Sequence, residues 1–217
     1  MSDFAAARLH MVQNQLQPNK VTDNRVAAAL SNVPRERFVP DAVSGVAYLD
    51  EDIEIASGRY LMEPMVLARL LQAGEAEPGD LALDVGCGSG YSSAVLAQLV
   101  GTVVALESDA ELTARATAVL ADLGVDSAVV VSGALADGQA KQGPYNLILL
   151  GGSVPAVPQS LQDQLDEGGR LLAVVDQNGV GVATMITRRG EKFLSEALFD
   201  AMVPPLPGFE QKQGFVF

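Results

Sequence analysis

The sequence predicts an α/β fold in which helices cover a mostly parallel sheet, and two observations lead to this prediction. After residue 80, short apolar runs such as LALDVG, TVVALES, SAVVVSG, YNLILLGG and RLLAVVD alternate with longer segments of helical period. That alternation is typical of βαβ units. The dipeptide Asn178-Gly179 then precedes VGVATMITRR, which predicts a hairpin and antiparallel strands at the end of the sheet.

The first 75 residues have a different pattern. Apolar residues recur at helical spacing over 4–16, and in TDNRVAAALSNVP either Thr22 or Asp23 is placed to cap a second helix. The run AYLDEDIEIASGRYLM has no sustained helical period and is expected to be irregular or extended. The run EPMVLARLLQAG predicts a third helix that begins near Pro64 and ends at Gly74.

This change of pattern predicts the organisation of the chain. We expect residues 1–75 to form a helical extension on the substrate side and residues 76–217 to form the α/β domain, the two making one compact unit. The apolar tail Phe215–Phe217 is expected to dock on the domain or to complete an edge strand. The oligomeric state is left open.

Composition excludes several classes of function. The chain has 217 residues with 14 Lys and Arg against 27 Asp and Glu, a net charge of −13, which disfavours binding of nucleic acid. One cysteine, Cys87, and one histidine, His10, cannot build a Cys/His metal site or a disulfide framework, and a Ser-His-Asp hydrolase is difficult to assemble. No apolar run approaches the roughly 20 residues of a membrane span, so the sequence predicts a soluble, cytoplasmic protein.

The strongest chemical signal is a glycine-rich turn between a buried strand and a helix, LALDVGCGSGYSSAVLAQL. Gly86 and Gly88 allow a tight turn and a close approach of a ligand to the backbone. A dinucleotide fingerprint would place glycine at the sixth position, where this chain has Tyr91. The pattern G-x-G-x-G therefore implies no pyrophosphate.

An acidic residue, Glu107, ends the next predicted strand about 20 residues later, where it can accept hydrogen bonds from both ribose hydroxyls. A strand, this glycine turn, a helix, a strand and an acid form the arrangement seen in class I S-adenosylmethionine methyltransferases. A nicotinamide cofactor and a purely structural turn are the alternatives.

The expected fold is thus Rossmann-like, with a seven-stranded sheet. The residues expected at the cofactor are Asp84, Gly86, Cys87, Gly88, Ser89, Gly90, Glu107, Ser108, Ala134 and Leu135. Cys87 is expected to pack as a small apolar side chain and not to act as a nucleophile.

Longer segments resemble one family. VTDNRVAAALSNVPRERFVP followed by AYLD, the glycine turn, and GPYNLILLGGSVPAVPQSLQDQLDEGGRLLAVV are similar to segments of protein-L-isoaspartate (D-aspartate) O-methyltransferases, over about residues 8–175. The resemblance implies a repair enzyme that methylates the α-carboxylate of isoaspartyl residues in proteins, with S-adenosylmethionine as donor, S-adenosylhomocysteine as product and no metal.

The chain departs from the family where the acceptor is expected. The family's run Ile-Gly-x-Gly-Gln-Thr-Ile-Ser-Gln-Pro corresponds to residues 55–64, IASGRYLMEP, so that its Thr and Ser become Tyr60 and Met62. The family's Gly-Asp-Gly appears as Gly133-Ala134-Leu135. The resemblance implies that Ser57, Gly58, Arg59, Tyr60 and Met62 face the acceptor, where Tyr60 or Arg59 can replace the missing hydroxyls. A different acceptor, and a cofactor-binding homologue with weak or no isoaspartyl activity, stay open.

Overall fold

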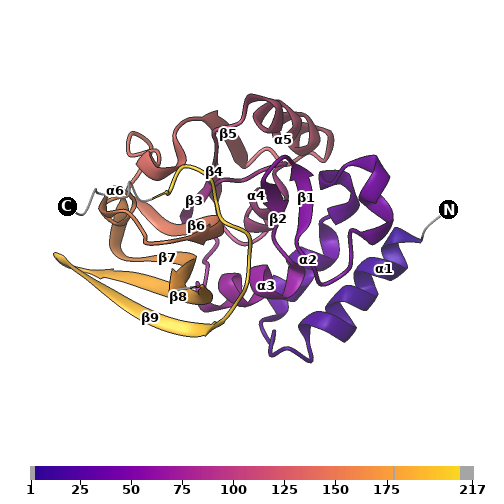
Figure 1. Ribbon diagram of the computed structural model, residues 1–217, viewed down its shortest axis with the longest axis horizontal. Helices are drawn as coiled ribbons and strands as arrows, with labels where there is room; N and C mark the ends of the chain where they lie inside the picture. The colour runs from indigo at the N-terminus through magenta and orange to yellow at the C-terminus, as the bar shows by residue number, and fades with distance from the viewer. Residues whose placement is uncertain (1–2, 178, 211–217) are drawn as a thin grey trace, which may run out of the picture.

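A seven-stranded sheet dominates the computed structural model of the protein, which describes residues 3–177 and 179–210 (Figure 1). The strand order is β5-β4-β3-β6-β7-β8-β9; the pairs from β5 to β7 are parallel, and β8 and β9 are antiparallel additions. The predicted fold class is confirmed. The strands are β3 (Leu81–Val85), β4 (Thr102–Glu107), β5 (Ala128–Ser132), β6 (Tyr145–Val154), β7 (Leu165–Gln177), β8 (Val180–Arg189) and β9 (Lys192–Asp200).

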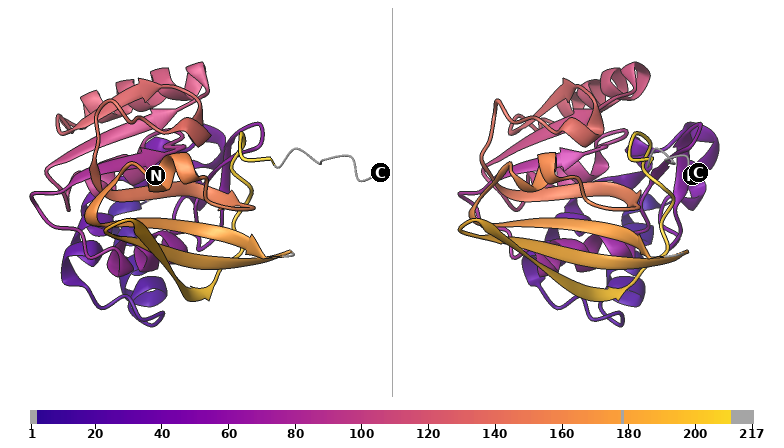
Figure 2. Two further views of the ribbon diagram at one scale, coloured as in Figure 1. Left: turned by 90° about the vertical axis from the view of Figure 1, so that its left-hand side faces the viewer. Right: turned by 60° about the vertical axis from the view of Figure 1, so that its left-hand side comes forward.

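The central strands are buried on both faces, which explains their continuous apolar sequence. Along β3, Ala82 belongs to the hydrophobic cluster on one face of the sheet, while Leu83 and Val85 belong to the cluster on the other. The antiparallel end of the sheet is clear in Figure 2, where β7, β8 and β9 run side by side. Gln177 pairs with Val180 there, as a hairpin requires, whereas Asn178 and the tail from residue 211 lie outside the described residues.

Longer helices cover the first face. Buried residues of the amino-terminal helices and of α3 and α4 share one cluster with Leu147 and Leu149 of β6. Asp23 caps α2 through its side chain, Pro64 opens α3 and Gly74 ends it, as expected. The helices are α1 (Phe4–His10), which continues as a π-helix over Met11–Leu16, α2 (Asn24–Asn32), α3 (Pro64–Ala73), α4 (Tyr91–Leu96) and α5 (Ala110–Asp122); 3₁₀ helices span Arg35–Phe38 and Asp41–Val46.

The second face has shorter cover. A 3₁₀ helix over Leu135–Asp137, helix α6 (Gln159–Gln162) and the segment around Leu206 pack against it. Helix α6 is shorter than the helical pattern of PQSLQDQLDEGG suggests. The chain leaves the helix because β7 already begins at Leu165. Just before it, the side chain of Gln164 accepts a hydrogen bond from the amide of Gln139 and donates one to the carbonyl of Asp137.

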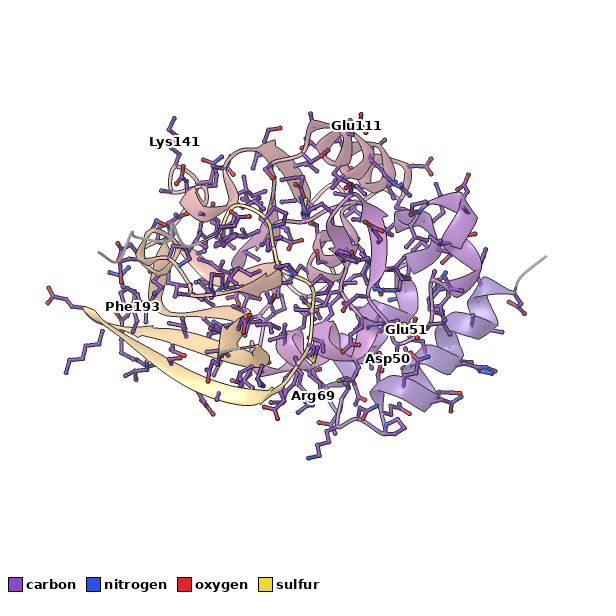
Figure 3. All side chains as sticks on the ribbon, viewed as in Figure 1. Asp50, Glu51, Arg69, Glu111, Lys141 and Phe193 are labelled. Carbon is purple, nitrogen blue, oxygen red and sulfur yellow. The ribbon has the colours of Figure 1, made fainter. Side chains whose placement is uncertain are left out.

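Helix α3 is held from two sides, by the sheet and by the loop that precedes β1. The guanidinium of Arg69 on α3 lies 3.6 Å from the ring centroid of Phe199 on β9, and Figure 3 labels Arg69 at this junction. Asp50, labelled in the same view, accepts a hydrogen bond from the amide of Met65 in the first turn of α3. These contacts fix α3 between the sheet and the loop that precedes β1.

A small hairpin follows that loop. Strands β1 (Ile53–Ala56) and β2 (Arg59–Leu61) pair antiparallel, with Gly58 at φ +67° in the turn. The sequence indicated irregular or extended chain, and the structure makes the extended part a hairpin. The hairpin places Ile55 against Gly88 of the glycine-rich turn and Arg59 against Glu107 at the end of β4.

Candidate cofactor and acceptor site

The glycine-rich turn joins β3 to α4 in the conformation that its glycines permit. Gly86, Gly88 and Gly90 have φ values of +76°, +58° and +97°, which side chains other than glycine rarely adopt. The amides of Gly86 and Cys87 both donate to the carbonyl of Leu106 on β4. The turn is therefore held against the carboxyl end of the neighbouring parallel strand.

Asp84 lies at the end of β3 and is fully buried. Its Oδ2 accepts hydrogen bonds from the hydroxyls of Ser92 and Ser93, each at 2.6 Å, whereas Oδ1 is buried and has no partner among the described residues. Burial, which outweighs the two serine hydrogen bonds, raises the pKa of Asp84 to about 6, and the Glu107 carboxylate adds to the rise. An unpartnered buried oxygen is costly, so Oδ1 is suited to a donor from outside the chain.

Glu107 ends β4 on the other side of the turn and is also fully buried. Its carboxylate accepts backbone hydrogen bonds from Gly88 at 2.8 Å, Ser108 at 2.7 Å and Asp109 at 3.0 Å. Three amides and the edge of a parallel sheet therefore fix the orientation of the carboxylate. The sequence placed Asp84 and Glu107 at this edge, and the structure brings them to either side of the glycine turn.

Arg59 contacts Glu107 directly. Its Nη1 donates to Oε1 at 2.5 Å and its Nη2 donates to Oε2 at 2.7 Å, in a bidentate pair whose side chains are 7% and 0% exposed. The sequence placed Arg59 beside the acceptor. The structure places its guanidinium on the carboxylate that was expected to hold a ribose.

Two apolar side chains take up the remaining space over the turn. A Cβ added at Gly86 would lie 2.6 Å from Cδ1 of Leu206, and one added at Gly88 would lie 2.7 Å from Cδ1 of Ile55. The cavity that Gly86 and Cys87 line holds about 20 Å³. A single water needs about 10–15 Å³ and ligand sites commonly hold 300 Å³ or more. The buried carboxylates of Asp84 and Glu107 and the open backbone of the glycines have the chemistry that an adenosyl amino acid requires, while Ile55 and Leu206 lie over the glycines and Arg59 lies on Glu107.

The other residues expected at the cofactor have separate roles. Cys87 is 3% exposed and packs with Ala105 and Ala116, and burial raises the pKa of its thiol. The hydroxyl of Ser89 donates to the carbonyl of Phe38 at 2.5 Å, which ties the turn to the amino-terminal extension. Ala134 precedes the 3₁₀ helix that begins with Leu135, a buried member of the cluster on the second sheet face.

The residues expected at the acceptor lie on or next to the β1–β2 hairpin. Ser57 and Gly58 form its turn, Tyr60 is half-buried in β2, and Met62 is buried just beyond it. A small cavity of about 10 Å³ is lined by several of them and by the carboxyl-terminal segment. Its lining residues are Asp52, Gly58, Arg59, Tyr60, Met62, Gly151, Gly152, Val203, Pro204, Pro205 and Leu206.

Sequence reasoning missed Arg35, which is fully buried in the RERF helix. It donates to the carbonyls of Ala47 and Met62 at 2.7 and 2.9 Å, and its guanidinium lies 4.8 Å from the ring centroid of Tyr91. Arg35 thus links the first residue of α4 to the acceptor-side segment. The distinctive PRERFVP run was the available signal, but it does not reveal which of its two arginines is buried.

Sequence reasoning also missed Leu206 and Gly151. Leu206 donates its amide to the carbonyl of Ser153 at 2.8 Å, and the amide of Ser153 donates to Pro204 at 2.9 Å, so the segment after β9 runs along β6. A Cβ at Gly151 would lie 2.5 Å from the carbonyl oxygen of Gly86. Strand β6 therefore touches the glycine turn through a glycine.

Residues 3–177 and 179–210 contain neither a candidate metal site nor a helix that could span a membrane. No group of three His, Cys, Asp or Glu side chains in this part of the chain comes together to hold a metal ion. None of its helices has the length and apolar character that crossing a membrane requires.

Known proteins match the chain over nearly its whole length. The sequence model of the family described as Protein-L-isoaspartate(D-aspartate) O-methyltransferase (PCMT) matches residues 7–207. A protein-L-isoaspartate O-methyltransferase of Koribacter versatilis is 34% identical over 96% of this chain and 94% of its own length. One from Methylorubrum extorquens is 39% identical over 87% and 82%.

Solved structures agree on the fold. A protein-L-isoaspartate O-methyltransferase superposes with a TM-score of 0.81 at 22% identity, over 93% of this chain and 67% of the other. A beta-aspartate methyltransferase (PCMT) from Plasmodium falciparum in complex with S-adenosyl-L-homocysteine gives 0.78 at 20% identity, over 96% and 100%. With the family match over residues 7–207, these findings place the chain in the protein-L-isoaspartate(D-aspartate) O-methyltransferase family.

Proposed function

We propose that the protein is an S-adenosylmethionine-dependent carboxyl O-methyltransferase that acts on L-isoaspartyl residues of damaged proteins. The observation that carries the proposal is the placement of Asp84 and Glu107, at the carboxyl ends of neighbouring parallel strands, on either side of the glycine turn. Ligands of open α/β sheets bind at this edge. The names of the relatives supply the reaction and the acceptor class.

The chain's own residues would hold the cofactor in the following way. Oδ1 of Asp84 would accept from the amino group of the amino-acid part, since it lacks a partner among the described residues. Glu107 would accept from the ribose hydroxyls, and the glycines at 86 and 88 would let the ligand approach the backbone. The cofactor, when bound, supplies a methyl group on a sulfonium.

The reaction requires no further catalytic group from the protein. An acceptor carboxylate has a pKa near 4, so it is ionised at neutral pH and needs no general base. The contribution of the protein is to hold the acceptor oxygen in line with the methyl donor. The hairpin and Met62 border the small cavity that also contacts Gly151, and we place the acceptor on that side.

Tyr60 and Met62 favour a second candidate, a methyltransferase with a different acceptor. Where the family has Thr and Ser, this chain has one phenol and one thioether. Loss of a hydroxyl donor to a carboxylate costs about 1–3 kcal/mol, which slows turnover about 5- to 150-fold unless Tyr60 replaces it. The closed space over Gly86 and Gly88 favours a third candidate, a family member with little cofactor binding. A cytoplasmic location and the absence of nucleic-acid partners stay predictions.

Methyl transfer from isotopically labelled S-adenosylmethionine to an isoaspartyl peptide tests the proposal, with the aspartyl isomer as control. We expect a base-labile methyl ester on the isoaspartyl peptide only. The Asp84→Ala variant, which loses the proposed partner of the amino group, serves as the inactive control. Transfer to neither peptide at saturating cofactor would exclude the isoaspartyl assignment, and equal transfer to both would indicate a broader carboxyl acceptor.

A further inference from the structure

The carboxylate of Glu107 has all of its hydrogen-bonding capacity in use. A carboxylate offers about four lone-pair positions. The amides of Gly88, Ser108 and Asp109 donate to it, and Arg59 adds two more donors. These five donors exceed the four positions, and Arg59 takes one position on each carboxylate oxygen, where the two hydroxyls of a ribose would otherwise donate.

The Arg59 side chain reaches Glu107 because the hairpin carries it there. Strand β2 begins at Arg59, directly after the Gly58 turn, and Ile55 of β1 lies over Gly88. The guanidinium is buried, planar and bidentate, the geometry in which an arginine binds a carboxylate most strongly. Arginine thus competes at the same atoms that a ribose would use.

We propose that Arg59 determines the affinity of this protein for its cofactor by holding Glu107, so that a nucleoside binds only when the guanidinium has left the carboxylate. The inference rests on the proposed cofactor site. Apparent affinity falls in proportion to the fraction of molecules in which Glu107 is free. A neutral side chain of similar length at position 59 would remove the competitor and leave the three backbone amides on Glu107 unchanged.

The test compares binding of S-adenosylhomocysteine to the unaltered protein and to Arg59→Gln by titration calorimetry. We expect Arg59→Gln to bind at least about tenfold more tightly, which corresponds to about 1.4 kcal/mol. The matched control is Arg37→Gln, which makes the same change of charge at an arginine paired with Asp122 on the surface. We expect the control to bind like the unaltered protein. Equal or weaker binding by Arg59→Gln overturns the inference.

Two further measurements separate competition at Glu107 from general loosening of the hairpin. The gain should appear with adenosine and be absent with 2′,3′-dideoxyadenosine, because only the former carries the hydroxyls that need Glu107. The double variant Arg59→Gln/Glu107→Gln should lose the gain. An equal gain with the dideoxy compound would overturn the inference.

Folding of the variants is checked by thermal unfolding without ligand. Should Arg59→Gln fail to fold, Arg59→Lys replaces it, because an ammonium keeps the charge but lacks the bidentate fork. We expect Arg59→Lys to bind S-adenosylhomocysteine more tightly than the unaltered protein, and an unchanged affinity would count against the proposal.

The outcome is independent of the proposed reaction. Isoaspartyl methylation by the unaltered protein, with no gain of affinity in Arg59→Gln, would leave the function standing and overturn the inference. Tighter binding by Arg59→Gln without methylation of either peptide would support the inference and overturn the proposed function.

Discussion

Arg59 and Glu107 lie 48 positions apart in the chain and share two parallel hydrogen bonds inside the protein. The pair joins the small hairpin to the carboxyl edge of the main sheet. Because each side chain is shielded from water, each depends on the other to compensate for its burial.

Glu107→Gln tests this dependence. The variant leaves the Arg59 guanidinium buried without a counter-charge and turns an amide NH₂ toward backbone donors, so we expect a loss of about 3–5 kcal/mol in the free energy of unfolding. Urea denaturation measures it. The double variant Glu107→Gln/Arg59→Gln should lose less free energy of unfolding than the losses of the two single variants added together, since the two residues are coupled. Strict additivity would show that the pair contributes nothing.

Asp84 predicts a pH dependence of stability. Its pKa is raised from 3.8 to about 6 in the folded protein, so the folded state holds this proton more tightly than the unfolded state does. The free energy of unfolding should therefore fall as the pH rises from about 4 to about 6, by about 3 kcal/mol in total from this group.

Asp84→Asn isolates that contribution. The stability of the unaltered protein minus that of the variant should decrease across the same pH interval and stay constant above it. Glu63, whose pKa burial and the nearby Asp52 and Asp50 raise to about 7, titrates in both proteins and cancels. Urea unfolding of both proteins at a series of pH values measures this difference in stability. A difference that does not change with pH would contradict the raised pKa of Asp84.

The two arginines of the RERF helix should respond differently to the same substitution. Arg35→Lys cannot keep both carbonyl contacts and the Tyr91 contact, so we expect a loss of about 2–4 kcal/mol in the free energy of unfolding. Arg37→Lys changes an exposed ion pair with Asp122 and should cost less than about 0.5 kcal/mol. Chemical denaturation compares the two, and similar losses would refute the structural distinction.

Cys87 should be unreactive in the native protein. It is buried and the pKa of its thiol is raised, so little thiolate is available to an alkylating reagent. Mass spectrometry after iodoacetamide treatment should find Cys87 unmodified under native conditions and modified in urea. Native labelling as fast as labelling of the unfolded chain would show that the turn opens to solvent.

Gly151→Ala should displace the glycine turn. The added methyl would lie 2.5 Å from the carbonyl oxygen of Gly86, a backbone atom that cannot rotate away. We expect a loss of at least about 2 kcal/mol in the free energy of unfolding, whereas Gly79→Ala, where a methyl meets nothing within 4 Å, should cost less than about 1 kcal/mol. Thermal and urea unfolding check both, and equal effects would contradict the described contact.

Much of the fold could be predicted from the sequence because the residues that determine it lie close together in the chain. Alternating apolar runs gave the parallel strands, Asp23 and Gly74 marked helix ends, and the spacing from the glycine turn located Glu107 at a strand end. The hairpin was only partly readable, since IEIASGRYL is short and its strands have just four and three residues.

The partner of Arg59 was not readable from the sequence. Side-chain partners far apart in the chain follow from packing, and the sequence carries no periodic signal for them. The same holds for Leu206, which meets Gly86 only because the chain turns back along β6 after β9. Both of the residues that most change the interpretation of the glycine turn come from segments outside it.

The return of the chain along β6 gives residues 201–206 a direct part in covering the glycine turn at the carboxyl edge of the sheet. A protein shortened to end at Asp200 would lose the leucine that covers Gly86, and that side of the glycine turn would be exposed to water. Truncation before Leu206 would therefore alter the glycine turn itself and not only the end of the described chain.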